Sequence, residues 1–503
     1  MPNYLKALFV ILVLATIVFA FTKRPANNII GAADFTRRRN LWFALTIAAF
    51  LSPNFWVLVL ITVILLSYAK RHENNPLALF FFILFVLPMA SVQIPGMGLV
   101  NFIFDLTYIR LLTLLILVPA FLSLRRQSDH LAFGRTGPDK ALFAYLLLST
   151  VLYLRDDTHT LTSYLRQSFY AGVDVVLPYI VVSRSLKSMQ AFREVLLSLV
   201  IPIMVLALIA CAEFYKQWLL YEPVTGALQM EEAISTYLIR DGMLRVVASA
   251  GQPIVLGYLM AVGIGLYLFL QHSIPQKFHR RLGMALLVVG LLVPVSRGPW
   301  IGSIVLLVVF VAAGRFASRR LMSLALVAML VLPLLSVLPG GERVINLLPF
   351  VGSTEKENVD YRSDLLTNAT IVIMRNPWFG STDYLETPEM EAMRQGQGII
   401  DIVNSYLSVT LISGFVGLGL FLAFFAATLW GILRAMRSIP DKGSEEHLLG
   451  RALLSSLMAI LVIIFTVSSI SFIPIVYWSV AGMGVAYIQM VRKSANGSRV
   501  NSY

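Results

Sequence analysis

The sequence predicts an all-α polytopic membrane protein, and three observations carry this prediction. Of the 503 residues, 58% are hydrophobic and only 13% are charged, and the mean hydropathy is +0.78. These values lie far outside the balance of a soluble domain. Apolar runs of bilayer-spanning length recur along most of the chain. Lipid offers no partner to unpaired backbone groups, so each crossing should be helical.

The apolar runs predict about 12 to 15 transmembrane helices. We interpret the first run as a retained helix, because no clear small-residue cleavage site precedes the basic TKRPANN segment. The runs lie near residues 5–22, 41–69, 77–92, 106–124, 141–154, 171–183, 193–212, 252–271, 283–295, 299–314, 321–338, 406–433, 452–472 and 475–490.

The run at 41–69 is too long for one plain crossing. Basic residues stand at both of its ends, Arg37 to Arg39 before it and Lys70 and Arg71 after it, and LSPN interrupts it. This pattern favours a tight helical hairpin. One kinked and tilted helix is the alternative.

Lysine and arginine residues predict the orientation, because basic loops of membrane proteins face the cytoplasm. Alternation from the basic loops places residues 213–250 and 339–405 in the periplasm. Residues 339–405 carry ten acidic and five basic side chains, in a chain whose net charge is +13. The basic groups assigned to the cytoplasm are Arg125 and Arg126, Arg184 and Lys187, Lys277, Arg280 and Arg281, Arg315, Arg319 and Arg320, Arg434, Arg437 and Lys442, and Arg492 and Lys493.

These assignments divide the chain into three parts. Residues 1–338 are predicted to hold the N-terminal transmembrane helices and the smaller periplasmic loop at 213–250. Residues 339–405 form the large periplasmic loop. Residues 406–503 hold the C-terminal transmembrane helices and a basic cytoplasmic tail.

The large loop is predicted to be partly helical. In NVDYRSDLLTNATIVIMRNPWFG, Asp360 is a candidate cap and Asn376 with Pro377 is a stop signal. A second short helix is expected at TPEMEAM, where Thr387 can cap and Pro388 suits the first turn. We therefore expect a folded lid or a substrate-binding surface. The apolar residues at helical spacing in the first helix are Leu365, Leu366, Ala369, Val372 and Ile373.

The order of several motifs resembles the O-antigen ligase and polymerase superfamily. The first motif places an arginine before a span, in MLRVVASAGQPIVLGYLM. The second lies between two spans, in SRGPWIG. Two longer motifs follow in order, YRSDLLTNATIVIMRNPWFG and then DIVNSYLSVTLISGFVGLGLFL. The motifs cover residues of about 240 to 435. No motif is specific by itself, and the ordered set carries the resemblance.

The resemblance implies a multi-pass protein of the bacterial inner membrane with the GT-C glycosyltransferase architecture. Members of such a family move a glycan from undecaprenyl diphosphate to an acceptor hydroxyl in the periplasm, without a nucleotide sugar or an essential metal ion, so no cofactor is expected. The expected partners are the undecaprenyl-diphosphate-linked glycan and the lipid bilayer. Other polysaccharide export and chain-length proteins are further candidate partners, and nucleic acid is not one.

The chain departs from the ligase branch at the end of the outer loop. Ligases carry a histidine before the asparagine there, and this chain has Val403 before Asn404. His159 is the one histidine on the predicted outer side. The difference favours a polymerase of repeat units. An O-antigen or protein O-glycosylation ligase is the alternative, and a lipid-linked glycan transporter ranks third, because we find no internal repeat.

Three arginines on outer segments could bind a diphosphate: Arg245, Arg297 and Arg362. Guanidinium groups stay charged and offer paired donors to phosphate oxygens. Arg297 lies between two apolar runs, where an unneeded charge is costly. The alternative for each arginine is snorkelling or a structural ion pair.

A base for the acceptor hydroxyl would be a carboxylate or an imidazole. Asp401 lies two residues before Val403, Asp383 and Glu386 follow the Pro377 turn, and His159 is a further candidate. The alternative for each is an ordinary solvated loop residue. Asn404 and Trp378 complete the predicted substrate-binding set, Trp378 by stacking on a sugar face, although tryptophan is also common at membrane interfaces.

Overall fold

The computed structural model describes residues 2–98, 100–127, 131–155, 160–228, 239–240, 242–337, 356–395 and 398–500. Helices account for nearly all of its regular structure. The helices of the first half are α1 (Asn3–Ile29), α2 (Ala32–Leu51), α3 (Phe55–Lys70), α4 (Pro76–Ile83), α5 (Tyr108–Leu112), α6 (Val118–Arg125), α7 (Gly137–Leu154), α8 (Leu161–Tyr170), α9 (Leu177–Ser185) and α10 (Met189–Lys216).

The second half continues the helical pattern. Its helices are α11 (Glu222–Ala227), α12 (Pro253–Leu270), α13 (Lys277–Leu292), α14 (Arg297–Ala312), α15 (Ala317–Val337), α17 (Lys356–Arg375), α18 (Pro388–Glu391), α19 (Ser405–Arg437), α20 (Glu445–Ile464) and α21 (Ile473–Val500). The remaining elements are two π-helical segments, η1 (Thr113–Leu117) and η2 (Ala171–Val176), the short 3-10 turns η3 (Ala248–Ala250), η4 (Gln271–Ser273) and η5 (Tyr384–Glu386), and the strands β1 (Ser91–Pro95), β2 (Phe102–Thr107), β3 (Ile239–Arg240) and β4 (Met243–Leu244).

The protein is a polytopic, mainly α-helical membrane protein. Seven helical segments among the described residues are long and apolar enough to cross a membrane, and α3 and α14 are shorter apolar helices. The larger number of about 12 to 15 crossings stays a prediction. The seven candidate spans are Asn3–Ile29, Tyr108–Arg125, Met189–Lys216, Pro253–Ser273, Ser405–Arg437, Glu445–Ile464 and Ile473–Ala495.

The run at 41–69 forms a hairpin of α2 and α3, broken at Ser52 to Asn54. The basic start of α2 lies beside the end of α3, because Arg37 donates to the carbonyl of His72 at 2.7 Å and Arg38 pairs with Glu73 at 2.6 Å. A single kinked helix could not bring these ends together.

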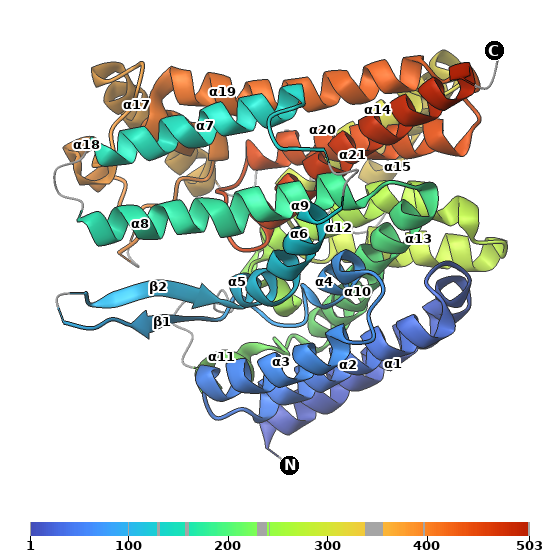
Figure 1. The fold of residues 1–503 in the computed structure, drawn as a ribbon, viewed down its shortest axis with the longest axis horizontal. Helices are drawn as coiled ribbons and strands as arrows, with labels where there is room; N and C mark the ends of the chain where they lie inside the picture. Colours follow the sequence, from blue (N-terminus) through green and yellow to red (C-terminus); the bar gives the residue numbers. More distant parts are fainter. Residues whose placement is uncertain are drawn as a thin grey trace.

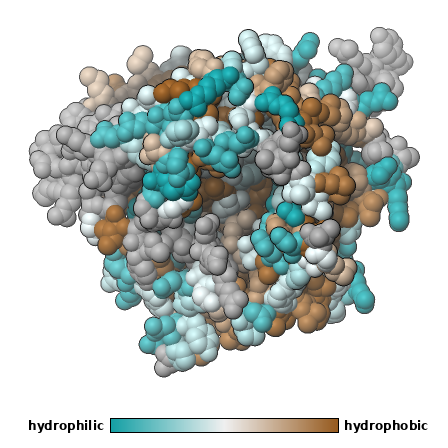
Figure 2. Space-filling view, turned by 90° about the vertical axis from the view of Figure 1, so that its left-hand side faces the viewer, coloured by the Kyte–Doolittle hydropathy of each residue, from teal (hydrophilic) through white to brown (hydrophobic). Residues whose placement is uncertain are grey.

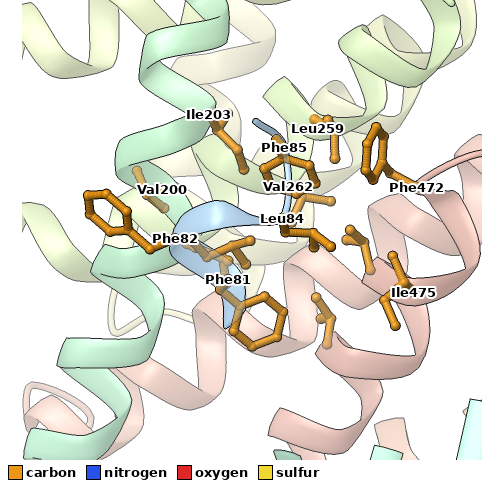
Figure 3. Packing of buried hydrophobic residues seen from close by; sticks show 14 of the residues in the cluster. Phe81, Phe82, Leu84, Phe85, Val200, Ile203, Leu259, Val262, Phe472 and Ile475 are labelled. Atoms are coloured by element: carbon orange, nitrogen blue, oxygen red, sulfur yellow. The ribbon is translucent and has the colours of Figure 1, made fainter. Parts of the chain in front are cut away.

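The run at 77–92 does not form a full-length helix. It forms the eight-residue helix α4 and then turns, deep among α10, α12 and α21 (Figure 3). Phe82, Leu84 and Phe85 are at most 1% exposed. The backbone carbonyls that the short helix leaves open are bound by protein, since Tyr108 donates to Ile83 at 3.0 Å and Ser249 donates to Phe85 at 2.6 Å. Broken helices are tolerated at membrane depth when protein satisfies their backbone in this way.

Several elements outside the candidate spans gather at one end of the molecule (Figure 1). The β1–β2 hairpin, α11, α17, α18 and the start of α8 lie on the left in that view, and the C-terminus lies on the right. We call the left end the α17 end. Figure 2 looks onto the α17 end, where hydrophilic side chains gather in the upper half of the visible face.

The predicted loop helices occur, with two corrections. α17 ends at Arg375 before Asn376 and Pro377, as expected, but it begins at Lys356, so Asp360 lies inside the helix and does not cap it. Of its five predicted apolar contacts, Leu366 is 56% exposed, while the other four are buried. Thr387 stands at the start of α18, but its hydroxyl donates to the carbonyl of Tyr384 at 2.7 Å instead of capping.

Candidate functional site

A short polar loop at the α17 end lies at the centre of the candidate site. It joins α20 to α21, spans residues 465–472 with the sequence FTVSSISF, and we call it the α20–α21 loop. The end of α20 and the start of α21 are apolar and buried, so the polar residues are confined to this connection. Four hydroxyl side chains in eight residues give it many donors and acceptors.

Two of the three predicted arginine segments contact this loop at Thr466. Arg362 extends from α17 and donates to the carbonyl of Thr466 at 3.3 Å. Arg297 is the first residue of α14, and its neighbour Gly298 packs directly on Thr466, where an added Cβ would lie 2.1 Å from the hydroxyl oxygen. Arg297 is half-buried. Its charge lies at the positive end of the α14 dipole, so both favour an anion at this point.

The Arg245 segment approaches the α20–α21 loop from a third direction. Ser471 donates to the carbonyl of Ala250 at 3.4 Å, and the segment of residues 245–250 leads directly into α12. Arg245 is half-buried. Glu213, fully buried at the end of α10, accepts backbone N–H groups from Val247 at 3.1 Å and Ala248 at 2.9 Å. These bonds fix the backbone next to Arg245.

Backbone strain is concentrated around the same loop. Three of the four non-glycine residues with positive φ among the described residues lie in it or within three residues of its contacts. Ser471, at 50°, belongs to the loop; Ala248, at 46°, is two residues before Ala250; and Val295, at 49°, is three residues before Gly298. A β-branched residue such as Val295 is rarely found there. Strained backbone of this kind tends to occur at ligand clamps and active sites, where the surrounding structure holds it in place.

Asp401 lies beside the α20–α21 loop and is exposed. Ser468 donates to its carboxylate at 3.0 Å and also contacts the carbonyl of Ile402. Tyr361 of α17 donates to the carbonyl of Asp401 at 3.0 Å. Burial raises the pKa of Tyr361, and the nearby Asp401 charge adds to the effect. Tyr361 is therefore a neutral hydrogen-bond donor at physiological pH.

Asn404 has a structural task in this arrangement. Its side-chain oxygen caps α19 by accepting the N–H groups of Tyr406 at 2.9 Å and Leu407 at 3.2 Å. Ser405 next to it donates to the carbonyl of Val467 at 2.7 Å. The start of α19 is thus anchored to the α20–α21 loop, which accounts for an asparagine here without direct substrate contact.

Asp383, Glu386 and Trp378 lie on the segment that follows α17. Asp383 accepts from Thr382 at 2.7 Å, and Glu386 is exposed on the same turn. This region packs on α19 at two places. Tyr384, next to Asp383, lies in one apolar cluster with Ile402 and Leu407. Gly414, at φ 64°, lets the Trp378 carbonyl approach so closely that a Cβ there would lie 2.3 Å away. Trp378 itself is 66% exposed. Gly414 is nine residues along α19 from Ser405, about 13 Å by helical rise.

His159 lies outside the described residues. Thr466 and Ser468 also belong to the candidate site. Their only sequence signal is a cluster of hydroxyl residues between two apolar runs. Trp300 of α14 donates its indole N–H to the carbonyl of Leu291 at 2.9 Å and so ties α14 to α13.

The arrangement offers cations and one carboxylate around a single loop. Arg297 and Arg362 come from segments that meet at Thr466, Arg245 precedes the segment that meets Ser471, and Asp401 lies at Ser468. A site of this composition can bind an anionic group and accept a proton from a nearby hydroxyl. Among the described residues, no group of three or more histidine, cysteine or acidic side chains could hold a metal ion.

Comparison with known proteins identifies part of the chain. Residues 282–422 match the Wzy_C family, described as O-antigen ligase. The matched stretch includes Arg297, Arg362, Asp401 and Asn404. No curated protein matches the chain.

Proposed function

We propose that this enzyme is a polysaccharide polymerase. Residues 282–422 match the Wzy_C O-antigen ligase family. The members of this family are glycosyl-transferring enzymes that act on lipid-linked glycans in a membrane. It joins undecaprenyl-diphosphate-linked oligosaccharide repeat units into O-antigen or exopolysaccharide on the periplasmic face of the inner membrane. The observation that carries the proposal is the meeting of the Arg245, Arg297 and Arg362 segments at the α20–α21 loop beside Asp401.

In the proposed reaction, the bond between the anomeric carbon of one glycan and its diphosphate oxygen breaks. The electron pair leaves with the undecaprenyl diphosphate, while a hydroxyl oxygen of the second glycan bonds to the anomeric carbon and releases its proton. Negative charge therefore grows on the departing diphosphate. Arg297, Arg245 and Arg362 stabilise that charge, because fixed cations need no reorganisation as the charge develops.

Asp401 is the proposed proton acceptor. Its carboxylate is exposed to an incoming hydroxyl, and the Ser468 hydroxyl holds it by donating to one oxygen. A carboxylate oxygen keeps further acceptor capacity after one hydrogen bond. Asp383 and Glu386 are weaker candidates, since, among the described residues, neither side chain hydrogen-bonds to the α20–α21 loop.

The test is chain extension in vitro with purified protein and lipid-linked repeat units. Asp401→Asn keeps the shape of the side chain and removes its basicity, so the rate should fall by about 10² or more. Asp383→Asn is the matched control, an exposed acid between α17 and α19, and should extend chains at close to the native rate. If Asp401→Asn extends chains as fast as Asp383→Asn, Asp401 is not the base.

The ligase alternative has one specific observation in its favour, the description of the matched family as O-antigen ligase. Val403 in place of a histidine before Asn404 supports the polymerase. A deletion separates the two. Loss of long chains, with a single repeat unit still on the lipid anchor at the cell surface, indicates a polymerase. Complete loss of glycan from the surface acceptor, with polymer retained on the lipid carrier, indicates a ligase.

A further inference from the structure

A cavity of about 260 Å³ lies between α7, α8, η2 and α21. Its wall is rich in aromatic rings that carry hydroxyl groups, and it includes one carboxylate. The tyrosines are Tyr145, Tyr153, Tyr164, Tyr170 and Tyr477, and the acid is Asp174. Further serine, threonine and glutamine side chains line it, so much of the surface can hydrogen-bond.

The acid in this cavity is held by an arginine. Arg110 of α5 donates to Asp174 from Nε at 3.1 Å and from Nη2 at 2.8 Å, and its guanidinium lies 3.6 Å from the ring centre of Tyr170. The Arg110 side chain is 14% exposed and that of Asp174 is 31% exposed, so Asp174 is the more accessible of the pair. A charged pair within apolar segments is costly and usually marks a functional site.

The local backbone is also unusual. Asp174 belongs to the π-helical segment η2, and Arg110 lies three residues before the start of the other such segment, η1. π-helical turns are rare and occur frequently at functional sites, because the extra residue turns a side chain away from its regular direction. Here η2 directs Asp174 toward Arg110 and the cavity.

The chemistry of the wall indicates the class of ligand. A sugar ring presents an apolar C–H face, which packs on an aromatic ring, and hydroxyl groups at its rim, which need donors and acceptors. Tyrosine rings beside an accessible carboxylate provide both. A polyprenyl chain would gain nothing from Asp174, and burying that carboxylate against hydrocarbon would be unfavourable. The volume is near the lower limit for small-molecule sites and suits about one or two sugar rings.

We propose that this cavity binds a sugar of the oligosaccharide repeat unit, with Asp174 accepting hydrogen bonds from sugar hydroxyls. This inference rests on the proposed function and adds a saccharide subsite to it. The cavity adjoins the candidate site, because its wall includes Pro474 and Tyr477 at the start of α21, directly after the α20–α21 loop. One glycan can therefore reach both places: its reacting end at the loop and a further sugar in the cavity.

The test separates sugar binding from diphosphate binding by using two probes with purified full-length protein. The first probe is the free oligosaccharide that mild acid releases from the lipid-linked repeat unit, which lacks phosphate. The second is undecaprenyl diphosphate, which lacks sugar. The variants are Asp174→Asn and Tyr164→Leu, and the matched control is Leu165→Ala, at a neighbouring α8 position that is 58% exposed.

We expect the native protein and Leu165→Ala to bind the oligosaccharide equally, and both cavity variants to bind it about tenfold or more weakly. All four proteins should bind undecaprenyl diphosphate alike, which also shows that the variants fold. Equal oligosaccharide binding by all four, or none by the native protein, overturns the proposal. Weakened binding of undecaprenyl diphosphate in the cavity variants would assign the cavity to the lipid and overturn it too. If instead the proposed diphosphate site is wrong, the arginine variants will keep full activity, and the cavity variants will still bind the oligosaccharide more weakly.

Discussion

Glu213 offers a prediction that connects a buried contact to the candidate site. Its carboxylate is inaccessible to solvent and accepts three backbone N–H groups. One oxygen binds Leu220 at 2.9 Å, and the other binds Val247 and Ala248 at 3.1 and 2.9 Å. The second pair holds the backbone that follows Arg245. We therefore expect Glu213 to position Arg245 without touching the substrate.

The size of the effect follows from these three bonds. A buried N–H left without a partner costs about 1–3 kcal/mol, so Glu213→Ala, which removes all three acceptors, should cost about 3 kcal/mol or more. In one rotamer of Glu213→Gln, the side-chain oxygen still accepts the N–H groups of Val247 and Ala248. The amide NH₂ group then faces the N–H of Leu220, which loses its acceptor. It should cost about 1–3 kcal/mol. The order of destabilisation is thus Ala greater than Gln greater than native.

The assay is thermal unfolding of the purified full-length protein in detergent, followed by chain extension at a temperature where every variant is folded. Glu222→Gln is the matched control, because Glu222 is a nearby exposed acid on α11. Glu213→Ala should unfold several degrees lower and should lose activity even while folded. The reasoning is refuted if Glu213→Ala unfolds at the temperature of Glu222→Gln and extends chains at the native rate.

Two further predictions concern orientation and close packing. In a background without the native cysteine, a cysteine at Thr367 on α17 should react with an impermeant thiol reagent in intact cells, whereas one at Ser494 should react only after permeabilisation; the reverse pattern would contradict the predicted topology. Gly298→Ala should strongly reduce chain extension, because the new methyl group would displace Thr466, whereas Gly419→Ala meets nothing within 4 Å and should be neutral. Equal activity of both glycine variants would show that the contact at Thr466 has no influence on catalysis.

Elements with a strong local signal were predictable from the sequence. The hairpin of α2 and α3 follows from basic residues at both ends of a long apolar run with a proline in its middle. The helical spacing of apolar residues predicts most of the buried face of α17, and Asn376 and Pro377 predict where the helix ends. The start of α17 was mispredicted, because Asp360 is a good capping residue by type and the preceding residues carry no apolar period.

The centre of the candidate site was not predictable in the same way. In the sequence, the hydroxyl residues of the α20–α21 loop look like an ordinary connection between two spans. Their partners are also distant in sequence, since Thr466 accepts a hydrogen bond from Arg362 and Ser471 donates one to Ala250. Arg110 and Asp174 each stand alone in an apolar run, so the pair becomes visible only when the chain folds. Their presence within predicted spans was nevertheless a signal, since such charges seldom lack a role.

The central claim is that Arg297 and Arg245 bind the diphosphate of the lipid-linked donor. The most direct measurement is the affinity of purified protein for undecaprenyl diphosphate, compared between the native protein, Arg297→Ala, Arg297→Lys and Arg245→Ala. Arg281→Ala, an exposed arginine in the first turns of α13, is the control. We predict that each of the two site alanine variants weakens binding by about tenfold or more, since a charge-assisted hydrogen bond is lost. Lysine should restore only part of it, because an ammonium group lacks the paired donors. Native affinity in both Arg297→Ala and Arg245→Ala would contradict the claim.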